Sequence, residues 1–166
     1  RAPWRGQSNR TVFMSFVGST RGSAQAVALR QLIARMCETV SDDVCTALVT
    51  DKWPGTSQIQ QGAIIGDEEK EHLRTALQVK RRSTFCLEPP GFAPNRKSMV
   101  DSLLSGCIPV FFWGSNDYIY YMDDHFGEWK REASVNLEPN NVLKKGEAAL
   151  LQTLHAIPKS RIEKMQ

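Results

Sequence analysis

Three residues at the predicted start of a helix, Arg96, Lys97 and Ser98, have the types needed to bind an anion. The first turn of a helix carries unpaired N–H groups and a partial positive charge, so cations there cost roughly 0.3–1 kcal/mol each. A bound phosphate would remove that cost, because backbone N–H groups, a hydroxyl and two positive side chains would hold it together. The alternative is a pair of solvated basic residues at an exposed helix end.

Asp101 lies one turn further along the same helix, on a face predicted to be polar with Ser98 and Ser105. A carboxylate at that place could accept hydrogen bonds from a ribose diol. Its spacing of four residues from Lys97 also predicts an ion pair worth about 0.2–0.5 kcal/mol, and spacing alone favours the ion pair. The opposite, apolar face is predicted to consist of Met99, Val100, Leu103 and Leu104.

The elements that would position these residues are a strand, a loop, a helix and a second strand. Thr84–Leu87 is a short apolar run that ends at two prolines and a glycine. Asn95 can cap the helix, Gly106 ends it, and Ile108–Phe112 is a second apolar run rich in β-forming residues. Two buried strands joined by a helix make a βαβ unit, which indicates parallel strands.

The whole chain alternates strands and helices, which predicts an α/β fold with a doubly wound, mostly parallel, Rossmann-like sheet. Further strands are expected at Thr11–Val17, Val44–Val49 and Ala133–Leu137, and further helices at Ser23–Thr39, Asp67–Lys80, Gly146–Ala156 and from Pro158 onward. Such sheets bind ligands at the carboxyl ends of their strands. Arg21, in the loop after the first strand, could therefore reach the same phosphate site, or it could be an exposed loop cation.

The central stretch closely resembles the exostosin-type inverting glycosyltransferases, in the half that binds the nucleotide sugar. The similarity rests on CLEPPG, then Arg96-Lys97-Ser98, Asp101-Ser102 and GCIPVFF, in the order and spacing of the plant, xyloglucan galactosyltransferase-like branch. It extends more weakly to FMSFVGSTRG and IPKSRIEKMQ, and so spans almost the whole chain. Phe92 departs from the family, which usually has an acidic residue there, and this leaves open any role of that carboxylate.

The resemblance implies one lobe of a GT-B fold that binds a UDP-sugar donor for transfer to a glycan acceptor, with no metal. The residues matched to nucleotide-sugar binding are Arg21, Gly91, Arg96, Lys97, Ser98 and Asp101. The cations would neutralise the leaving diphosphate, and glycine would let the backbone approach the ligand. The general base is unknown: Glu88 is a candidate by position, but it could be a surface residue, and the base could lie in a missing N-terminal acceptor lobe.

The resemblance also implies the lumenal side of the Golgi membrane, with any membrane anchor outside this chain. We expect a linker or tail over residues 1–10 and a nucleotide-sugar-binding domain over 11–166, a fragment of a larger enzyme that is inactive in isolation. No apolar run approaches the about 20 residues that a membrane-spanning helix needs. The net charge of +3 is too small to indicate nucleic acid or an anionic membrane surface as a partner.

The four cysteines match no zinc-site spacing. Cys37 and Cys45 flank a predicted helix-to-strand connection, where a disulfide and two free thiols remain open alternatives, and the resemblance to a secretory family favours the disulfide. For Cys86 and Cys107 the sequence favours buried free thiols over a bridge.

Other polar residues that could do chemistry are assigned structural roles. Asp123-Asp124-His125 reads as a solvated loop because three adjacent residues do not give metal-ligand geometry. His72 and His155 have no partner in sequence and are expected to be structural. Two alternative functions remain: a non-catalytic or degenerate nucleotide-binding domain, favoured by Phe92, and a phosphate-handling α/β protein such as a phosphatase, for which no nucleophile loop is recognisable.

Overall fold

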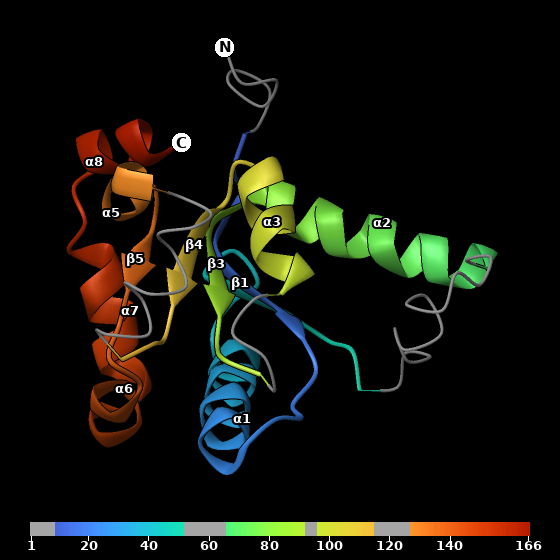
Figure 1. The fold of residues 1–166 in the computed structure, drawn as a ribbon, viewed down its shortest axis with the longest axis horizontal. Coiled ribbons are helices and arrows are strands. Elements are labelled where there is room, and N and C mark those ends of the chain that lie inside the picture. The colour runs from blue at the N-terminus through green and yellow to red at the C-terminus, as the bar shows by residue number, and fades with distance from the viewer. Residues whose placement is uncertain (1–8, 52–65, 92–95, 115–126) are drawn as a thin grey trace.

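A computed structural model describes the chain over residues 9–51, 66–91, 96–114 and 127–166. Its centre is a five-stranded sheet in the order β2-β1-β3-β4-β5, with every neighbouring pair parallel (Figure 1). The strands are β1 Val12–Gly18, β2 Cys45–Val49, β3 Ser83–Glu88, β4 Ile108–Phe111 and β5 Val135–Asn136. The predicted α/β, doubly wound, Rossmann-like fold is confirmed.

Helices cover both faces of the sheet (Figure 1). They are α1 Ala24–Thr39, α2 Asp67–Arg82, α3 Lys97–Leu104, η2 Gly127–Trp129, α5 Lys130–Ala133, α6 Pro139–Lys145, α7 Glu147–His155 and α8 Lys159–Met165. On one face, α1 contacts β1 and β2 and packs against α6 and α7. On the other, α2 and α3 contact each other, β1, β3 and β4.

The strands supply a core to each face because their side chains alternate in direction. The larger core includes Phe16, Phe85 and Phe112 and lies on the α1 face. The smaller one lies under α3, where Phe111 stacks on Trp113 with ring centroids 4.9 Å apart. Burial on both faces explains why the β3 and β4 segments read as continuous apolar runs in the sequence.

The strand order creates a switch point between β1 and β3. From β1 the chain moves outward to β2, then crosses back to place β3 on the other side of β1. Phe16 of β1 is in register with Leu87 of β3, so the loops that follow these two strands leave the sheet side by side. In doubly wound sheets this is the place where a crevice for ligands forms.

Two sequence predictions about α3 are wrong. The helix begins at Lys97, with Arg96 as an extended N-cap (φ −136°, ψ 144°), so Arg96 precedes the first turn. The predicted apolar face holds for Met99 and Leu103, which join the smaller core, but not for Val100 and Leu104, which are 53% and 60% exposed while Ser102 is fully buried. Asn95, the predicted cap, lies outside the described residues. Helix α3 is rotated about its axis relative to the prediction, so that Val100 and Leu104 face solvent.

Smaller differences concern the ends of elements. The last strand is two residues long and Ala133 belongs to α5, so the predicted Ala133–Leu137 strand is shortened. Helix α6 was not predicted, and Gly146, at φ +76°, separates it from α7. The ring of His155 stacks on Phe13 at 4.1 Å, which agrees with a structural role. The cluster Asp123-Asp124-His125 lies outside the described residues.

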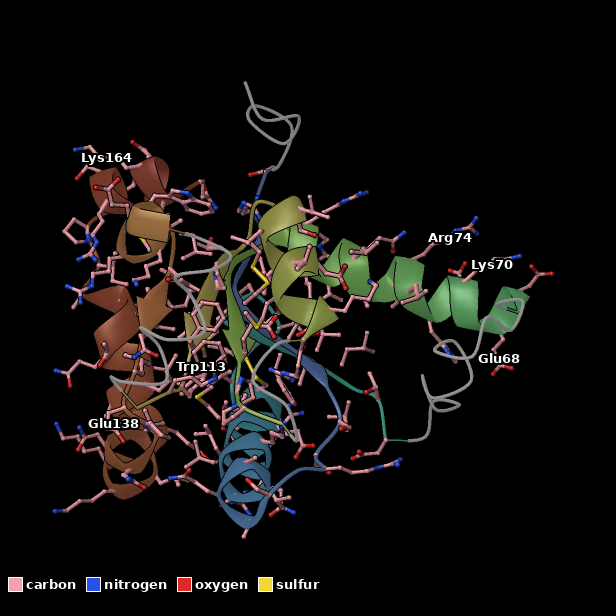
Figure 2. All side chains as sticks on the ribbon, viewed as in Figure 1. Glu68, Lys70, Arg74, Trp113, Glu138 and Lys164 are labelled. Atoms are coloured by element: carbon pink, nitrogen blue, oxygen red, sulfur yellow. A yellow bond between two sulfur atoms is a disulfide. The ribbon has the colours of Figure 1, made fainter. Side chains whose placement is uncertain are left out.

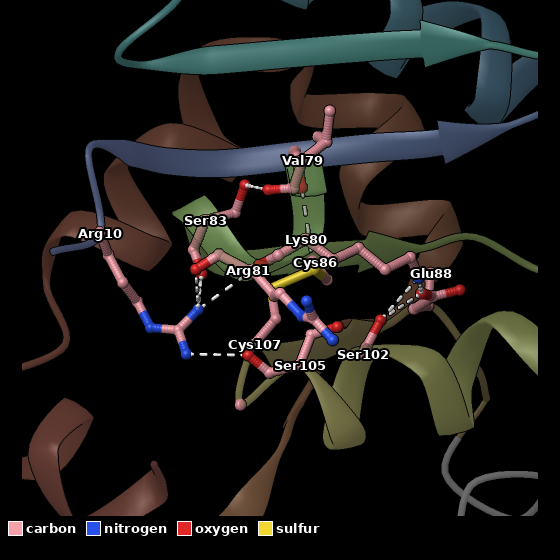
Figure 3. The surroundings of a disulfide bond; sticks show 12 residues. Arg10, Val79, Lys80, Arg81, Ser83, Cys86, Glu88, Ser102, Ser105 and Cys107 are labelled. Atoms are coloured by element: carbon pink, nitrogen blue, oxygen red, sulfur yellow. Dashed lines mark hydrogen bonds and ion pairs between the residues drawn. A yellow bond between two sulfur atoms is a disulfide. The ribbon is translucent and has the colours of Figure 1, made fainter. Parts of the chain in front are cut away.

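Two disulfides are present. Cys37 and Cys45, with Cα atoms 4.9 Å apart, join the end of α1 to the start of β2, so the predicted alternative of a bridge is confirmed. Cys86 and Cys107, 5.8 Å apart, join β3 to the turn before β4 (Figure 3), and the free thiols predicted there are wrong. Both residues are buried as expected. Their proximity follows from β3–β4 pairing, which puts Cys86 in register with Pro109.

We predict that the bridge between β3 and β4 contributes more to stability than the other. It closes the longer loop, with a sequence separation of 21 against 8. In the loop-entropy model these separations correspond to about 3.3 and about 2.5 kcal/mol. Guanidinium unfolding of Cys86→Ala/Cys107→Ala and of Cys37→Ala/Cys45→Ala measures both values. A larger loss for the second double variant would contradict the prediction.

Candidate functional site

Glu88, the last residue of β3, is a carboxylate buried at the carboxyl edge of the sheet. It is 2% exposed. Its Oε1 accepts hydrogen bonds from Lys80 Nζ and Ser102 Oγ, each at 2.7 Å (Figure 3). Its Oε2 accepts from the Ser98 hydroxyl and lies 3.4 Å from Arg96 Nη2. Glu88 therefore gathers one side chain from α2 and three from α3 and its cap.

Lys80 is the buried partner of that carboxylate. Its side chain is 3% exposed, and its ammonium group lies 2.7 Å from Glu88 Oε1, 2.8 Å from the Ser98 carbonyl and 2.7 Å from Ser102 Oγ. These three contacts match the three N–H groups of an ammonium ion. Its carboxylate partner was not predicted from the sequence.

This network explains the rotation of α3. Ser98 and Ser102 are four residues apart, so they lie on one face of the helix and both contact Glu88. Leaving a buried carboxylate without partners costs several kcal/mol, more than exposing two aliphatic side chains. The helix therefore presents its two serines to β3 and leaves Val100 and Leu104 in solvent.

The same contacts bear on Glu88 as a catalytic base. Burial raises the pKa of its carboxyl, but the nearby charges of Lys80 and Arg96, with hydrogen bonds from Lys80 and Ser98, outweigh that effect and hold the pKa below its ordinary value. A base needs a lone pair within reach of the substrate hydroxyl. Here both oxygens are occupied by protein donors, so a base role would need this network to open.

Arg30, on α1, joins the two loops at the switch point. It is 3% exposed. Its Nη1 donates to the Ser19 carbonyl at 2.5 Å, its Nε to Pro90 at 2.8 Å and its Nη2 to Pro89 at 3.1 Å. Sequence reasoning missed this residue. The available signal was its spacing, four residues after Ala26, which puts a cation on the buried face of a helix.

Arg96 approaches the same point from the other side. Its Nη2 donates to the Pro89 carbonyl at 2.5 Å, the group that Arg30 also contacts. The pKa of Arg30 is lowered to about 10, first by burial and next by the charge of Arg96, with Glu88 and Asp51 acting in the opposite direction. Lys80 and Arg96 share one buried carboxylate, and Arg30 lies beside them with carbonyl partners alone, so these four side chains carry an excess of two positive charges.

Arg21 lies in the loop after β1, at the same edge of the sheet. Its side chain is 66% exposed; its Nε is 3.6 Å from Asp51 Oδ1 and its Nη2 donates to the Asp51 carbonyl. Thr20 also donates to that carboxylate, through its amide at 3.0 Å and its hydroxyl at 2.6 Å. Asp51 therefore holds Arg21, and an anion would compete for this cation.

Gly91 lies where the two loops meet. A Cβ on Gly91 would stand 3.4 Å from both Arg30 Nη2 and Arg96 Cδ. Gly22, at φ +154°, faces it: a Cβ there would come within 2.9 Å of Ala26 Cβ and 3.7 Å of Gly91 Cα. Two residues without side chains thus let the loops touch beside the two guanidinium groups.

Lys97 and Asp101 form the ion pair that their spacing favoured. The Lys97 ammonium lies 2.8 and 2.7 Å from the two carboxylate oxygens, and its side chain is exposed. The ribose contact of Asp101 stays a prediction, and it would require Asp101 to share its oxygens with Lys97 or to release it.

Arg10 fixes the opposite end of α3. Its guanidinium donates to the carbonyls of Ser83 at 2.5 Å, Arg81 at 3.2 Å and Ser105 at 3.0 Å (Figure 3). These groups lie at the ends of α2 and α3, where carbonyls lack helical partners and a positive charge is favourable. The C-terminal end of α2 is thus joined to both ends of α3, through Lys80 near the start of α3 and through Arg10 at its end.

The part of the chain that the structure describes holds neither a cluster of metal ligands nor a membrane-spanning helix. Within residues 9–51, 66–91, 96–114 and 127–166, no three His, Cys, Asp or Glu side chains are placed to share a metal ion. The helices of that part of the chain are all too short or too polar to span a bilayer.

Comparison with known proteins shows which family this chain resembles. The family model described as the exostosin GT47 domain matches residues 4–154. The chain is 30% identical over 160 residues to the probable xyloglucan galactosyltransferase GT15 of Arabidopsis thaliana, covering 96% of this chain and 30% of that protein. For the probable xyloglucan galactosyltransferase GT13 of the same plant, identity is 32% over 157 residues, covering 95% and 30%.

The name of a third relative contains a different sugar. Xyloglucan-specific galacturonosyltransferase 1 of Arabidopsis thaliana is 39% identical over 77 residues, covering 43% of this chain and 12% of that protein. The chain thus spans 30% or less of the length of these relatives. The matches confirm the resemblance drawn from the sequence.

A double-mutant cycle tests the buried pair. Glu88→Gln leaves the Lys80 ammonium buried without its carboxylate, and we predict a loss of about 3–5 kcal/mol in the free energy of unfolding. Lys80→Met in the Glu88→Gln background removes the unpaired charge and restores most of that loss. Urea unfolding of the four proteins gives the coupling energy. Additive effects of the two substitutions would contradict the contact.

The pH dependence of stability provides a second test. Because folding holds the pKa of Glu88 below its ordinary value of 4.5, its contribution to stability is complete above that pH and is lost as the pH falls through the folded-state pKa. We predict that the free energy of unfolding falls less steeply below about pH 4.5 in Lys80→Met/Glu88→Gln than in the unmodified chain. Identical slopes for the two proteins would show that Glu88 does not titrate as described.

Proposed function

We propose that this chain, which belongs to the exostosin GT47 family, is the nucleotide-sugar-binding domain of a glycosyltransferase. The diphosphate of the donor would bind in the crevice between the ends of β1 and β3. The observation that carries the proposal is the excess of positive charge there, where Arg30 and Arg96 converge on the Pro89 carbonyl and only Arg96 contacts Glu88. An anion would offset the repulsion between the two guanidinium groups.

A second observation supports the same place. Among the described residues, the buried Nε of Arg96 has no hydrogen-bond partner. A buried donor without a partner costs free energy, and a phosphate oxygen at this point would remove that cost. Ser98, at the start of α3, and Arg21, across the crevice, add a hydroxyl and a further cation.

The chemistry proposed is inverting transfer of the sugar. The acceptor hydroxyl oxygen bonds to the anomeric carbon from the face opposite the diphosphate, the bond from that carbon to the diphosphate oxygen breaks, and a base takes the hydroxyl proton. Negative charge grows on the departing diphosphate, so the positive groups in the crevice stabilise the transition state more than the ground state. In this proposal the cationic side chains and backbone amides of the chain neutralise that charge, and no metal takes part.

The remaining parts of the enzyme are assigned outside this chain. We propose that it is one lobe of a GT-B enzyme, with the glycan acceptor bound by a second, N-terminal lobe. The enclosure of Glu88 among Lys80, Ser98 and Ser102 supports a general base located elsewhere, in that lobe or in another part of the protein. The isolated chain would then bind donor without turning it over. UDP-sugars are the donors we expect.

The proposed location is the lumenal side of the Golgi, with any membrane anchor outside this chain. Both disulfides support an oxidising compartment, since such bonds persist in secretory lumens and are rare in the cytosol. A second candidate function is a non-catalytic nucleotide-binding domain of the same fold. Phe92, in place of the family's usual acidic residue, favours it, and loss of transfer but not of UDP binding in the full-length protein would identify it.

Titration calorimetry with UDP tests the proposed site. We expect Arg96→Ala to weaken UDP binding by about 1–3 kcal/mol, because it removes a charged donor from the crevice. Arg74→Ala is the matched control: Arg74 is an exposed arginine on α2, paired with Glu71 and pointing into solvent (Figure 2), so UDP affinity stays unchanged. Equal UDP affinity of Arg96→Ala and the unmodified chain would remove the assignment.

A thermal-shift panel of nucleotides and nucleotide sugars identifies the donor. A ligand that binds only the folded chain raises the melting temperature according to its concentration and affinity. We expect uridine diphosphates to give the largest shifts, and the sugar that adds most to the shift of UDP is the donor. A larger shift with guanosine or adenosine diphosphates would contradict the UDP assignment.

A further inference from the structure

We propose that Arg30 is a positioning residue for nucleotide binding: it sets the spacing and orientation of the loops after β1 and β3 without touching the nucleotide. This inference rests on the proposed function. Arg30 is 3% exposed and all three of its nitrogen atoms donate to backbone carbonyls. It therefore acts on a ligand only through the two loops that it holds.

The geometry requires an arginine. One carbonyl, that of Ser19, belongs to the loop after β1, while those of Pro89 and Pro90 belong to the loop after β3. A guanidinium offers donors in a fixed planar fork, so three nitrogens can reach three separated carbonyls at once. A lysine keeps the charge but offers one nitrogen, which cannot reproduce these three contacts.

The contact to Pro90 also orients the next amide. In a trans peptide the C=O group and the N–H group that follows point in opposite directions, and the described residues contain no cis peptide. With the Pro90 carbonyl directed at Arg30, the N–H of Gly91 is directed away from it. Among the described residues, none accepts a hydrogen bond from this amide. It is thus available to an anion at the loop contact.

The two loops meet beside this amide, where a Cβ on Gly22 would be in contact with Gly91 Cα at 3.7 Å. The position of the loop after β1 depends on glycine, because Gly22 has φ +154° and a Cβ there would come within 2.9 Å of Ala26 Cβ in α1. Arg30 donates hydrogen bonds to both loops near this point. Burial and the nearby charge of Arg96 lower the pKa of Arg30 to about 10. Holding the two loops therefore carries an electrostatic cost, which a bound anion would reduce.

The test separates positioning from charge, because Arg30→Lys keeps the charge and loses the fork. We expect calorimetry with UDP to give a dissociation constant about tenfold higher or more for Arg30→Lys, and at least as high for Arg30→Gln, a change of the size expected when a charged hydrogen bond is lost. The matched control is Ile33→Val, a substitution one turn along α1 in the larger core. We expect it to lower stability and to leave UDP affinity unchanged.

A second variant reaches the loops without altering Arg30. Gly22→Ala displaces the loop after β1 from α1, because its Cβ would come within 2.9 Å of Ala26 Cβ, and we expect it to weaken UDP binding in the same way. It decides the outcome if Arg30→Lys does not fold. Folded Arg30→Lys or Gly22→Ala with the UDP affinity of the unmodified chain would overturn the inference, since the first would show that charge alone is sufficient and the second that loop spacing is not required.

The failure of the proposed function gives a different result. If the unmodified chain does not bind UDP, the proposed function falls, and hydrogen exchange of the ligand-free chain then decides the role of Arg30. Faster exchange at the amide of Thr20, which donates to Asp51, in Arg30→Lys but not in Ile33→Val would support a tie between the loops. Equal exchange in both variants would overturn it.

Discussion

The burial of one carboxylate, Glu88, determines how the site is built. At 2% exposure its charge is tolerated only because Lys80, Ser98 and Ser102 supply hydrogen bonds and an opposite charge. Those partners come from α2 and α3, so one buried anion fixes both helices against the end of β3. The exposed Val100 and Leu104 are a consequence, since α3 cannot bury its serines and its aliphatic residues on the same side.

The single negative charge of Glu88 does not balance the positive charges of Lys80, Arg96 and Arg30. Lys80 satisfies one oxygen of Glu88, and Arg96 approaches the other, while Arg30 is buried nearby with backbone carbonyls alone as partners. Two guanidinium groups this close repel each other, and a bound anion would offset that repulsion. The topology puts this imbalance at the switch point of a doubly wound sheet, so charge and fold both favour the proposed ligand site between the ends of β1 and β3.

Much of the fold follows from the sequence because strands buried on both faces give continuous apolar runs, and Gly and Pro mark their ends. The family was also identified, since its residues form a motif. The parts that were missed are polar residues in the interior. Residue type alone marks Ser102 and Arg30 as surface residues, and nothing local shows that Lys80 faces a carboxylate eight residues later. The Cys86–Cys107 bridge was missed because it depends on strand pairing.

The most direct test of the central claim is an experimental structure of the chain with UDP bound. We expect the diphosphate to lie between the ends of β1 and β3, with oxygen atoms within hydrogen-bond distance of the Arg96 side chain and the Gly91 amide, and with Lys80 still paired to Glu88. UDP bound at another edge of the sheet, or a diphosphate that contacts neither Arg96 nor the Gly91 amide, would contradict it.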